Sequence, residues 1–220
     1  MDAMLRFGSK ADAAATLEAL GRSLAMIEFD LKGTVLSAND NFCAVLGYSL
    51  AEIKGAHHSL FVDPAEARSQ DYAAFWAKLA RGEFDSREYR RIGKGGREVW
   101  IQATYNPVTN ARGAVTKVVK VATDITAQKQ RNADFEGKIA AISRVQAVIE
   151  FSLNGEVLDA NENFLKALGY DLAEVKGRHH SMFVEPAFAQ SAEYSDFWRR
   201  LNAGEFVAAE FKRIGKGGRE

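Results

Sequence analysis

Residues 34–58 read TVLSANDNFCAVLGYSLAEIKGAHH, and this stretch decides the local structure of the chain. A short β-type run, Thr34–Ala38, leads into an amphipathic helical segment that Asn39 or Asp40 caps. Ser49, followed three residues later by a glutamate, forms the capping-box pattern of a second short helix. The stretch therefore predicts a strand, two short helices and then an irregular segment that carries two histidines.

The chain contains this stretch twice, because residues 156–180 read EVLDANENFLKALGYDLAEVKGRHH. Residues Met26–Glu98 align without a gap with Val148–Glu220, and about 60% of the positions are identical. Such identity over this length indicates tandem copies of one domain of about 100 residues. The first copy continues from RIGKGGRE into VWIQATYNPVTNARGAVTKVVKVATDIT, whereas the second copy ends at Glu220. We therefore expect a fragment of a longer protein, with a second copy that lacks two strands.

The remaining elements of the first copy point to a mixed fold. Ala25–Phe29 is a β-type run, and aromatic and apolar residues at helical spacing predict a longer helix over about Ser69–Arg81. Three alternating runs follow, at Phe84–Ile92, Glu98–Pro107 and Ala114–Thr123. The order β-β-α-α-α-β-β-β predicts an α+β domain, an antiparallel sheet with helices on one face.

These elements divide the chain into an N-terminal helix over residues 1–24, a first domain over 25–126, a helical linker over 127–146 and an incomplete second domain over 147–220. Both helices carry apolar stripes. The stripes are formed by Leu17, Leu20 and Leu24 in the first helix and by Phe135, Ile139, Ile142 and Val145 in the second. They either dock on the domain's own sheet, the reading we favour slightly, or pair two copies of the chain as a homodimer.

Amino-acid composition argues against several classes of protein for this chain. The 220 residues contain 29 basic and 29 acidic side chains, so the chain lacks the positive field that nucleic-acid binding uses. It contains no run of the ~18 apolar residues that span a membrane and no secretory signal. Cys43 is the single cysteine, which excludes an internal disulfide and predicts a reducing, cytoplasmic location.

The first copy resembles a PAS domain. The resemblance is carried by VLSANDNFCAVLGYSLAEIKG, by the helix ending in FWAKLARGE, by KGGREVWIQATYNPV and by the terminal Asp124-Ile125-Thr126. The variant with HHS[LM]FV and YNPV is similar to PAS sensors of soluble bacterial methyl-accepting chemotaxis receptors and, more distantly, to the flavin-binding PAS domain of aerotaxis receptors. The resemblance implies a five-stranded sheet around a small-ligand pocket. It also implies an output helix after Thr126 and a signalling region, absent from these residues, that couples to a chemotaxis histidine kinase and its coupling protein.

All four histidines lie in two adjacent pairs at equivalent positions, His57-His58 and His179-His180. Adjacent side chains on irregular backbone point apart, so one member of each pair can face the pocket. Imidazole ligates haem iron and hydrogen-bonds flavins. The alternative is that the histidines only cap a helix or satisfy backbone groups. A zinc site is disfavoured because adjacent histidines without a nearby cysteine do not supply a tetrahedral set.

Aromatic residues complete the candidate cofactor set. Trp76 and Trp198 lie on the amphipathic helix that faces the pocket, where indole can stack on a flavin, pack on a porphyrin or simply fill the core. Phe61 and Phe183 follow the histidine pairs. We expect Trp100 in the core. Arg90, Arg91, Lys94 and Arg97 form a basic hairpin that we interpret as a solvated sheet edge, and Cys43 is expected to be a small core residue.

Two functions remain open at this point. In the first, the chain is the input module of a cytoplasmic chemotaxis receptor that senses redox state or oxygen through FAD or b-type haem, with FAD slightly preferred. In the second, the PAS copies hold no cofactor and serve as dimerisation modules with a packed core. No nucleophile elbow or metalloprotease signature is present, so we expect no enzymatic activity.

Overall fold

The computed structural model describes residues 10–219, which form two compact units divided between Asn132 and Ala133. The first unit is built on five strands: β1 (Ala25–Phe29), β2 (Val35–Ala38), β3 (Asp85–Ile92), β4 (Glu98–Thr109) and β5 (Val115–Asp124). They lie in the order β2-β1-β5-β4-β3, and every neighbouring pair is antiparallel. The α+β fold and all five strands are confirmed, with strand ends within two residues of the predicted ones.

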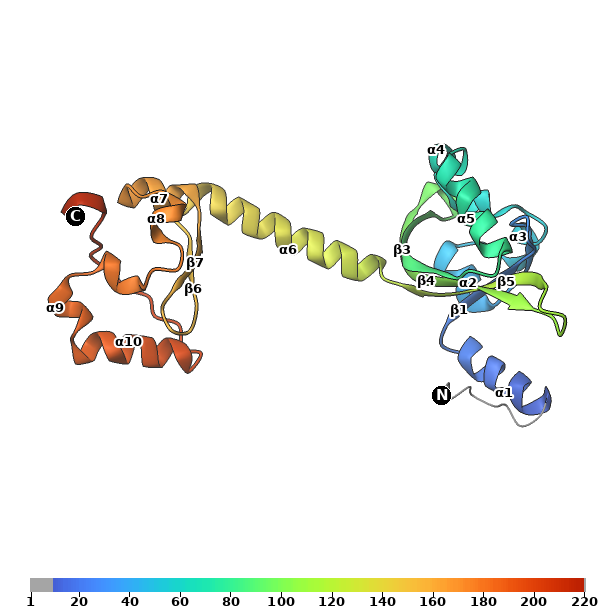
Figure 1. Ribbon diagram of the computed structural model, residues 1–220, viewed down its shortest axis with the longest axis horizontal. Coiled ribbons are helices and arrows are strands. Elements are labelled where there is room, and N and C mark those ends of the chain that lie inside the picture. Colours follow the sequence, from blue (N-terminus) through green and yellow to red (C-terminus); the bar gives the residue numbers. More distant parts are fainter. Residues whose placement is uncertain (1–9, 220) are drawn as a thin grey trace. The chain divides into compact units, whose positions relative to one another are not determined.

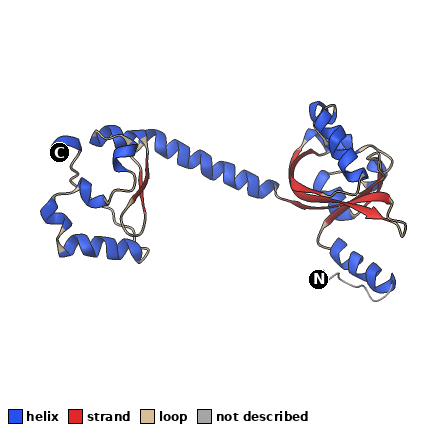
Figure 2. Cartoon of the chain, in the orientation of Figure 1, coloured by secondary structure: helices blue, strands red, loops and turns tan. Residues whose placement is uncertain are grey.

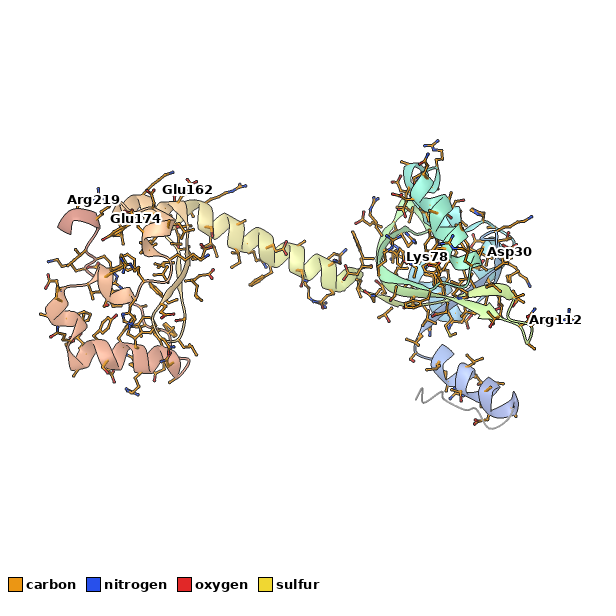
Figure 3. All side chains as sticks on the ribbon, viewed as in Figure 1. Asp30, Lys78, Arg112, Glu162, Glu174 and Arg219 are labelled. Atoms are coloured by element: carbon orange, nitrogen blue, oxygen red, sulfur yellow. The ribbon has the colours of Figure 1, made fainter. Side chains whose placement is uncertain are left out.

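Four short α-helices and one 3₁₀ turn pack against this curved sheet (Figure 1). They are α2 (Asp40–Leu46), α3 (Leu50–Ile53), η1 (His58–Phe61), α4 (Pro64–Ala67) and α5 (Gln70–Ala80). The Asn39 side chain caps α2 by accepting from the Phe42 amide, and Ser49 and Glu52 form the expected capping box of α3. α5 is fixed to the sheet edge by Lys78, labelled in Figure 3, whose Nζ lies 2.8 Å from Oδ2 of Asp85 on β3.

Strand alternation fills the interior. On β4 the inward positions are Val99, Ile101, Ala103 and Tyr105, all at most 2% exposed. On β5 the inward positions are Val118, Lys120 and Ala122, so the same period that buries valine and alanine also buries a lysine. Tyr105 and Lys120 are direct partners in the β4–β5 register. The core therefore contains a basic side chain at its centre.

The second unit repeats the first half of this architecture. After α6 (Thr126–Val145) come β6 (Ile149–Phe151), β7 (Val157–Ala160), α7 (Glu162–Leu168), α8 (Leu172–Val175), η3 (His180–Phe183), α9 (Pro186–Ala189) and α10 (Ala192–Asn202). Its sheet has two strands, and residues 205–215 form a loop (Figure 2). In the first unit β3 pairs only with β4, so the matching segment here has no partner strand among residues 10–219. Phe211 is accordingly 42% exposed, whereas its counterpart Tyr89 on β3 is 4% exposed.

The apolar stripes do not dock on their own sheets. α1 (Lys10–Gly21) leaves Leu17 and Leu20 exposed, and α6 has no buried residue, with Phe135 65% and Val145 80% exposed. The docking interpretation is therefore wrong for both helices as described. No helix within residues 10–219 combines the length and the apolar character needed to cross a membrane.

Candidate functional site

The two members of the first histidine pair have opposite environments. His57 precedes η1 and caps it: its Nδ1 accepts from the Ser59 amide, and its Nε2 lies 2.9 Å from the Lys32 carbonyl oxygen. His58 begins η1, and its backbone N–H donates to the Gly33 carbonyl at 2.7 Å. Its side chain is fully buried, whereas that of His57 stays on the surface side. One inward and one outward imidazole is the arrangement expected for adjacent residues.

His58 is held by two tyrosines. Its Nδ1 lies 2.8 Å from the Tyr72 hydroxyl on α5, and its Nε2 lies 2.9 Å from the Tyr105 hydroxyl on β4. Burial lowers the pKa of His58 well below its ordinary 6.5, and the positive charges of Arg91 and Lys120 lower it further. A neutral imidazole has one donor and one acceptor nitrogen, so it donates to one hydroxyl and accepts from the other. His58 thereby joins α5 to the centre of the sheet.

Aromatic rings enclose this imidazole. Their centroids lie 5.2–6.3 Å from that of His58 and belong to Phe29, Phe61, Tyr72, Phe75, Trp76 and Tyr105. Phe61 and Trp76, two of the candidate cofactor residues, are therefore neighbours of His58, with Phe61 0% and Trp76 8% exposed. Gly33 closes the outer side, since a Cβ at this position (φ +86°) would come within 2.9 Å of the Trp76 ring.

Three polar groups in this interior are unsatisfied. Among residues 10–219 no well-aligned hydrogen bond is formed by Lys120 Nζ, Arg91 Nε or Trp76 Nε1. Lys120 is 0% exposed, with Nζ 5.0 Å from the Tyr105 ring centroid and 5.4 Å from that of Phe42. Burial lowers its pKa well below the ordinary 10.5, and the charge of Arg91 adds to the effect. Buried donors without acceptors are costly, so this cluster marks a place where an acceptor is missing.

Arg91 corrects the interpretation of the basic hairpin. Arg90 is at the surface as expected, with Nε 2.5 Å from Glu98 Oε2. Arg91 is instead 2% exposed, stacks over Tyr89 with its guanidinium carbon 4.5 Å from the ring centroid, and donates to the Tyr105 hydroxyl at 3.3 Å. Adjacent strand residues face opposite sides of a sheet, and the inward side here belongs to Arg91.

The packing around His58 leaves no space there for either cofactor that the resemblance implies. Both nitrogens of His58 are engaged by tyrosine hydroxyls, and rings occupy the space around it, so a porphyrin iron does not fit against His58. Trp76 packs edge-on against Phe29, with centroids 5.6 Å apart, and against His58, which leaves these faces closed to a flavin ring. The side chains in this arrangement fit neither a haem at His58 nor a flavin stacked between His58 and Trp76.

The second unit preserves the histidine arrangement. His179 caps η3 through the Ser181 amide, and His180 is buried with its Nδ1 2.9 Å from the Tyr194 hydroxyl. Burial lowers the pKa of His180 to about 4. Phe183 is fully buried beside it, and Trp198 again has a buried Nε1 without a partner among residues 10–219. Residues 10–219 include no counterpart of Tyr105 in the second unit, so the first unit presents the fuller site.

Sequence reasoning missed four residues of the site: Tyr72, Tyr105, Arg91 and Lys120. Lys120 left a signal, because it occupies an inward position in the alternating run Val115–Asp124. Tyr72 and Tyr105 left none, since a tyrosine among apolar residues is typical of any core. Cys43 is a buried core residue, as expected.

The output side of the unit is a junction between β4 and α6. The Ile125 amide donates to the Trp100 carbonyl at 2.8 Å, and the Trp100 amide donates to Thr126 Oγ1 at 2.9 Å. Lys129 Nζ lies 5.2 Å from the Trp100 ring centroid and 2.5 Å from Glu88 Oε2. Trp100 is therefore half-exposed against α6, and its expected place in the core is wrong. The same strand carries Tyr105, so β4 connects His58 to the first turn of α6.

A second junction lies where each unit begins. The side-chain Nδ2 of Asn39 donates to the Gly21 and Leu24 carbonyls, and its Oδ1 accepts from the backbone amides of Met26 and Phe42. Asn161 repeats all four bonds in the second unit, with Ser143 and Gln146 as the two carbonyl partners. The end of α6 is thus held by the second unit, just as its first turn is held by β4.

Comparisons with known proteins agree with this architecture. A family model described as the PAS fold matches residues 35–122 and 157–220. The biofilm dispersion protein BdlA of Pseudomonas aeruginosa is 45% identical over 202 residues, which cover 92% of this chain and 48% of BdlA. The aerotaxis receptor of Escherichia coli is 29% identical over 97 residues, 44% of this chain and 19% of the receptor. The chain thus spans about half or less of the length of these two relatives.

Solved structures align with this chain at low sequence identity. A structure of an RNA-binding light-oxygen-voltage receptor aligns with a TM-score of 0.50 and 21% identity, over 66% of this chain and 41% of that one. A PAS domain from Colwellia psychrerythraea aligns with a TM-score of 0.47 and 19% identity, over 52% of this chain and 98% of that one. The family match falls on the repeated strand–helix stretch and covers most of both units, and the chain belongs to the PAS family.

Proposed function

We infer that this chain is the sensory input module of a cytoplasmic, chemotaxis-type receptor, a binding and signalling module and not an enzyme. The observation that supports this assignment is a continuous path of contacts, which runs from His58 through Tyr105 and along β4 to the hydrogen bond between Trp100 and Thr126. A change in the interior that moves Tyr105 acts on the same strand that holds the first turn of α6. The similarity to an aerotaxis receptor and to a biofilm dispersion protein supports this assignment.

The path is tested by removing one hydroxyl. Tyr105→Phe breaks the contacts to His58 and Arg91 without removing the ring, and we expect faster amide hydrogen exchange over residues 126–132 of α6. Tyr48→Phe is the matched control, because Tyr48 belongs to the same unit and its ring packs on Phe61, away from β4. Unchanged exchange at α6 in Tyr105→Phe would remove the basis of the proposal.

Kinase control is tested in the complete protein. A chemotaxis histidine kinase and its coupling protein would bind a signalling region outside these residues, so their response has to be measured there. In a reconstituted mixture Tyr105→Phe should change autophosphorylation of the kinase, and Tyr48→Phe should not.

The redox or oxygen input through FAD or b-type haem stays a prediction. The aromatic rings around His58 argue against a haem or flavin there, whereas the unsatisfied buried donors argue for a bound ligand. The absorption spectrum of the 220-residue chain, purified from cells supplied with riboflavin and a haem precursor, decides it. Flavin bands or a Soret band would establish the cofactor and require the rings around His58 to rearrange. A protein that stays colourless after reconstitution with either group would refute sensing through FAD or haem and would support the cofactor-free function.

The second candidate function is a cofactor-free dimerisation module, favoured by the ring-filled interior and the exposed apolar side chains of α6. Phe135, Ile139 and Ile142 recur at spacings of four and three, the pattern of a helix-pairing face. Ile139→Glu should therefore lower the mass measured by light scattering from dimer to monomer. Ala140→Glu introduces the same charge at an exposed position outside the stripe and should leave the mass unchanged. A monomeric unmodified chain excludes this candidate.

A further inference from the structure

A polar pocket of about 220 Å³ opens on the first unit between α4, α5 and β3. Its lining includes Tyr72, Phe75, Tyr89 and Arg91. Tyr72 contacts His58, and the other three contact Tyr105. Small-molecule sites for drug-sized ligands occupy roughly 300–1,000 Å³, so this pocket suits a compact molecule. Arg91, which lines the pocket, joins it to the interior cluster through the Tyr105 hydroxyl.

The charges on this path are unbalanced in the interior. Arg91 and Lys120 are both buried, whereas no Asp or Glu side chain within residues 10–219 is buried. Glu66 and Asp71 lie at the mouth of the pocket, where Glu66 Oε1 forms an ion pair with Arg91 Nη1 at 3.7 Å, longer than a hydrogen bond. Arg87 also lines the mouth and is paired with Asp85 at 3.3 Å. A buried guanidinium whose nearest carboxylate lies at the pocket mouth attracts an anion into the pocket.

The two tandem copies differ at this pocket. Its floor is retained, because Tyr72, Phe75 and Arg91 correspond to Tyr194, Phe197 and Arg213. Its rim is retained only in part. Ser69 and Asp71 correspond to Ser191 and Glu193, whereas Glu66, Arg87 and Tyr89 correspond to Phe188, Ala209 and Phe211. The matching pocket of the second unit therefore lacks the rim arginine and is more apolar on this side.

We propose that the first PAS unit binds a compact oxyanion, a small carboxylate or an inorganic anion of similar size, through Arg91 at the pocket floor and Arg87 at its mouth. The anion supplies the acceptor that Arg91 Nε lacks. Arg91 donates to the Tyr105 hydroxyl, so the bound anion acts on the residue that also holds His58. This inference rests on the proposed function, because it names the class of ligand sensed by the same interior.

Calorimetric titration of the 220-residue chain with acetate, succinate and inorganic phosphate tests the proposal, with chloride at matched ionic strength as the control. At least one of the three oxyanions should bind saturably with a Kd in the millimolar range or tighter, and chloride should not. Acetate or succinate alone identifies a carboxylate ligand, and phosphate alone identifies an inorganic one. Absence of saturable binding by all three overturns the proposal.

Variants locate the site. Arg91→Met removes the guanidinium from the pocket floor and should weaken binding about tenfold or more, the effect of losing a charge-assisted hydrogen bond. Arg87→Ala copies the rim of the second unit at an exposed position and should also weaken binding. Lys117→Met removes a partly exposed lysine of β5 and should leave the Kd unchanged. Equal Kd values for all three variants and the unmodified chain would place the anion elsewhere and overturn the assignment.

The two proposals fail separately. Saturable binding that leaves hydrogen exchange in α6 unchanged refutes the signalling path and keeps the anion site. A response of α6 to Tyr105→Phe without any oxyanion binding refutes the anion site and keeps the signalling path.

Discussion

Replacing Lys120 by methionine should stabilise the first unit. The lysine amine is fully buried, has no acceptor among residues 10–219 and shares the interior with Arg91. Methionine has a similar length and no donor, so it fills the same space without an unsatisfied group. Leaving a buried polar group unsatisfied costs about 1–3 kcal/mol, and we expect the free energy of unfolding to rise by about that amount. For a domain of this size the melting temperature should rise by roughly 5 °C for each kcal/mol.

The same substitution should change how stability depends on pH. The pKa of Lys120 is lowered in the folded unit and is about 10.5 in the unfolded chain, so between these two values the unfolded state binds more protons. The free energy of unfolding attributable to this group therefore rises with pH across that window and levels off above 10.5. Subtracting the Lys120→Met curve from the unmodified curve isolates this slope, because the tyrosines with raised pKa values are common to both proteins.

Urea unfolding at a series of pH values measures both effects. Hydrogen exchange at backbone amides of the first unit assigns the change to that unit. Lys117→Met is the control: it breaks an ion pair with Glu28 in which both side chains are about a third exposed, and it should cost less than about 1 kcal/mol. A Lys120→Met protein that is less stable than the unmodified chain, or that keeps the same pH slope, refutes the view of Lys120 as an unsatisfied buried amine.

Three further substitutions test the structure around the site. His58→Gln should flatten the loss of first-unit stability as pH falls below 6.5, because the unfolded chain protonates His58 there and the folded unit does not; an unaltered slope in urea midpoints contradicts this. Asn39→Ala removes a helix cap and three further hydrogen bonds and should cost about 2 kcal/mol or more in the same assay, and a cost near zero contradicts the junction. Gly33→Ala should cost more than Gly113→Ala. Both have positive φ, but only at Gly33 does the new Cβ meet the Trp76 ring; equal losses would show that the clash relaxes.

Some features of the candidate site could be predicted from residue patterns, and others could not. The division of His57 and His58 into an outward and an inward member follows from their adjacency on irregular backbone and could be predicted. The partners of His58 could not, because Tyr72 and Tyr105 are separated from it by 14 and 47 residues and only the packing of α5 on the sheet brings them together. Arg91 was misjudged for a related reason. A run of basic residues indicates a charged surface, and only the strand register decides which member turns inward.

By itself the sequence determined the duplication, the order of strands and helices, the caps at Asn39 and Ser49 and the PAS resemblance, because these depend on interactions within a few residues or on the repeat itself. The tertiary structure alone decided what occupies the interior. The pairing of β4 with β5 and the docking of α5 place His58 among six aromatic rings and bury Lys120 and Arg91 beside it, and these contacts join segments far apart in the chain. Burial and unsatisfied donors are properties of such long-range packing, so no local pattern encodes them.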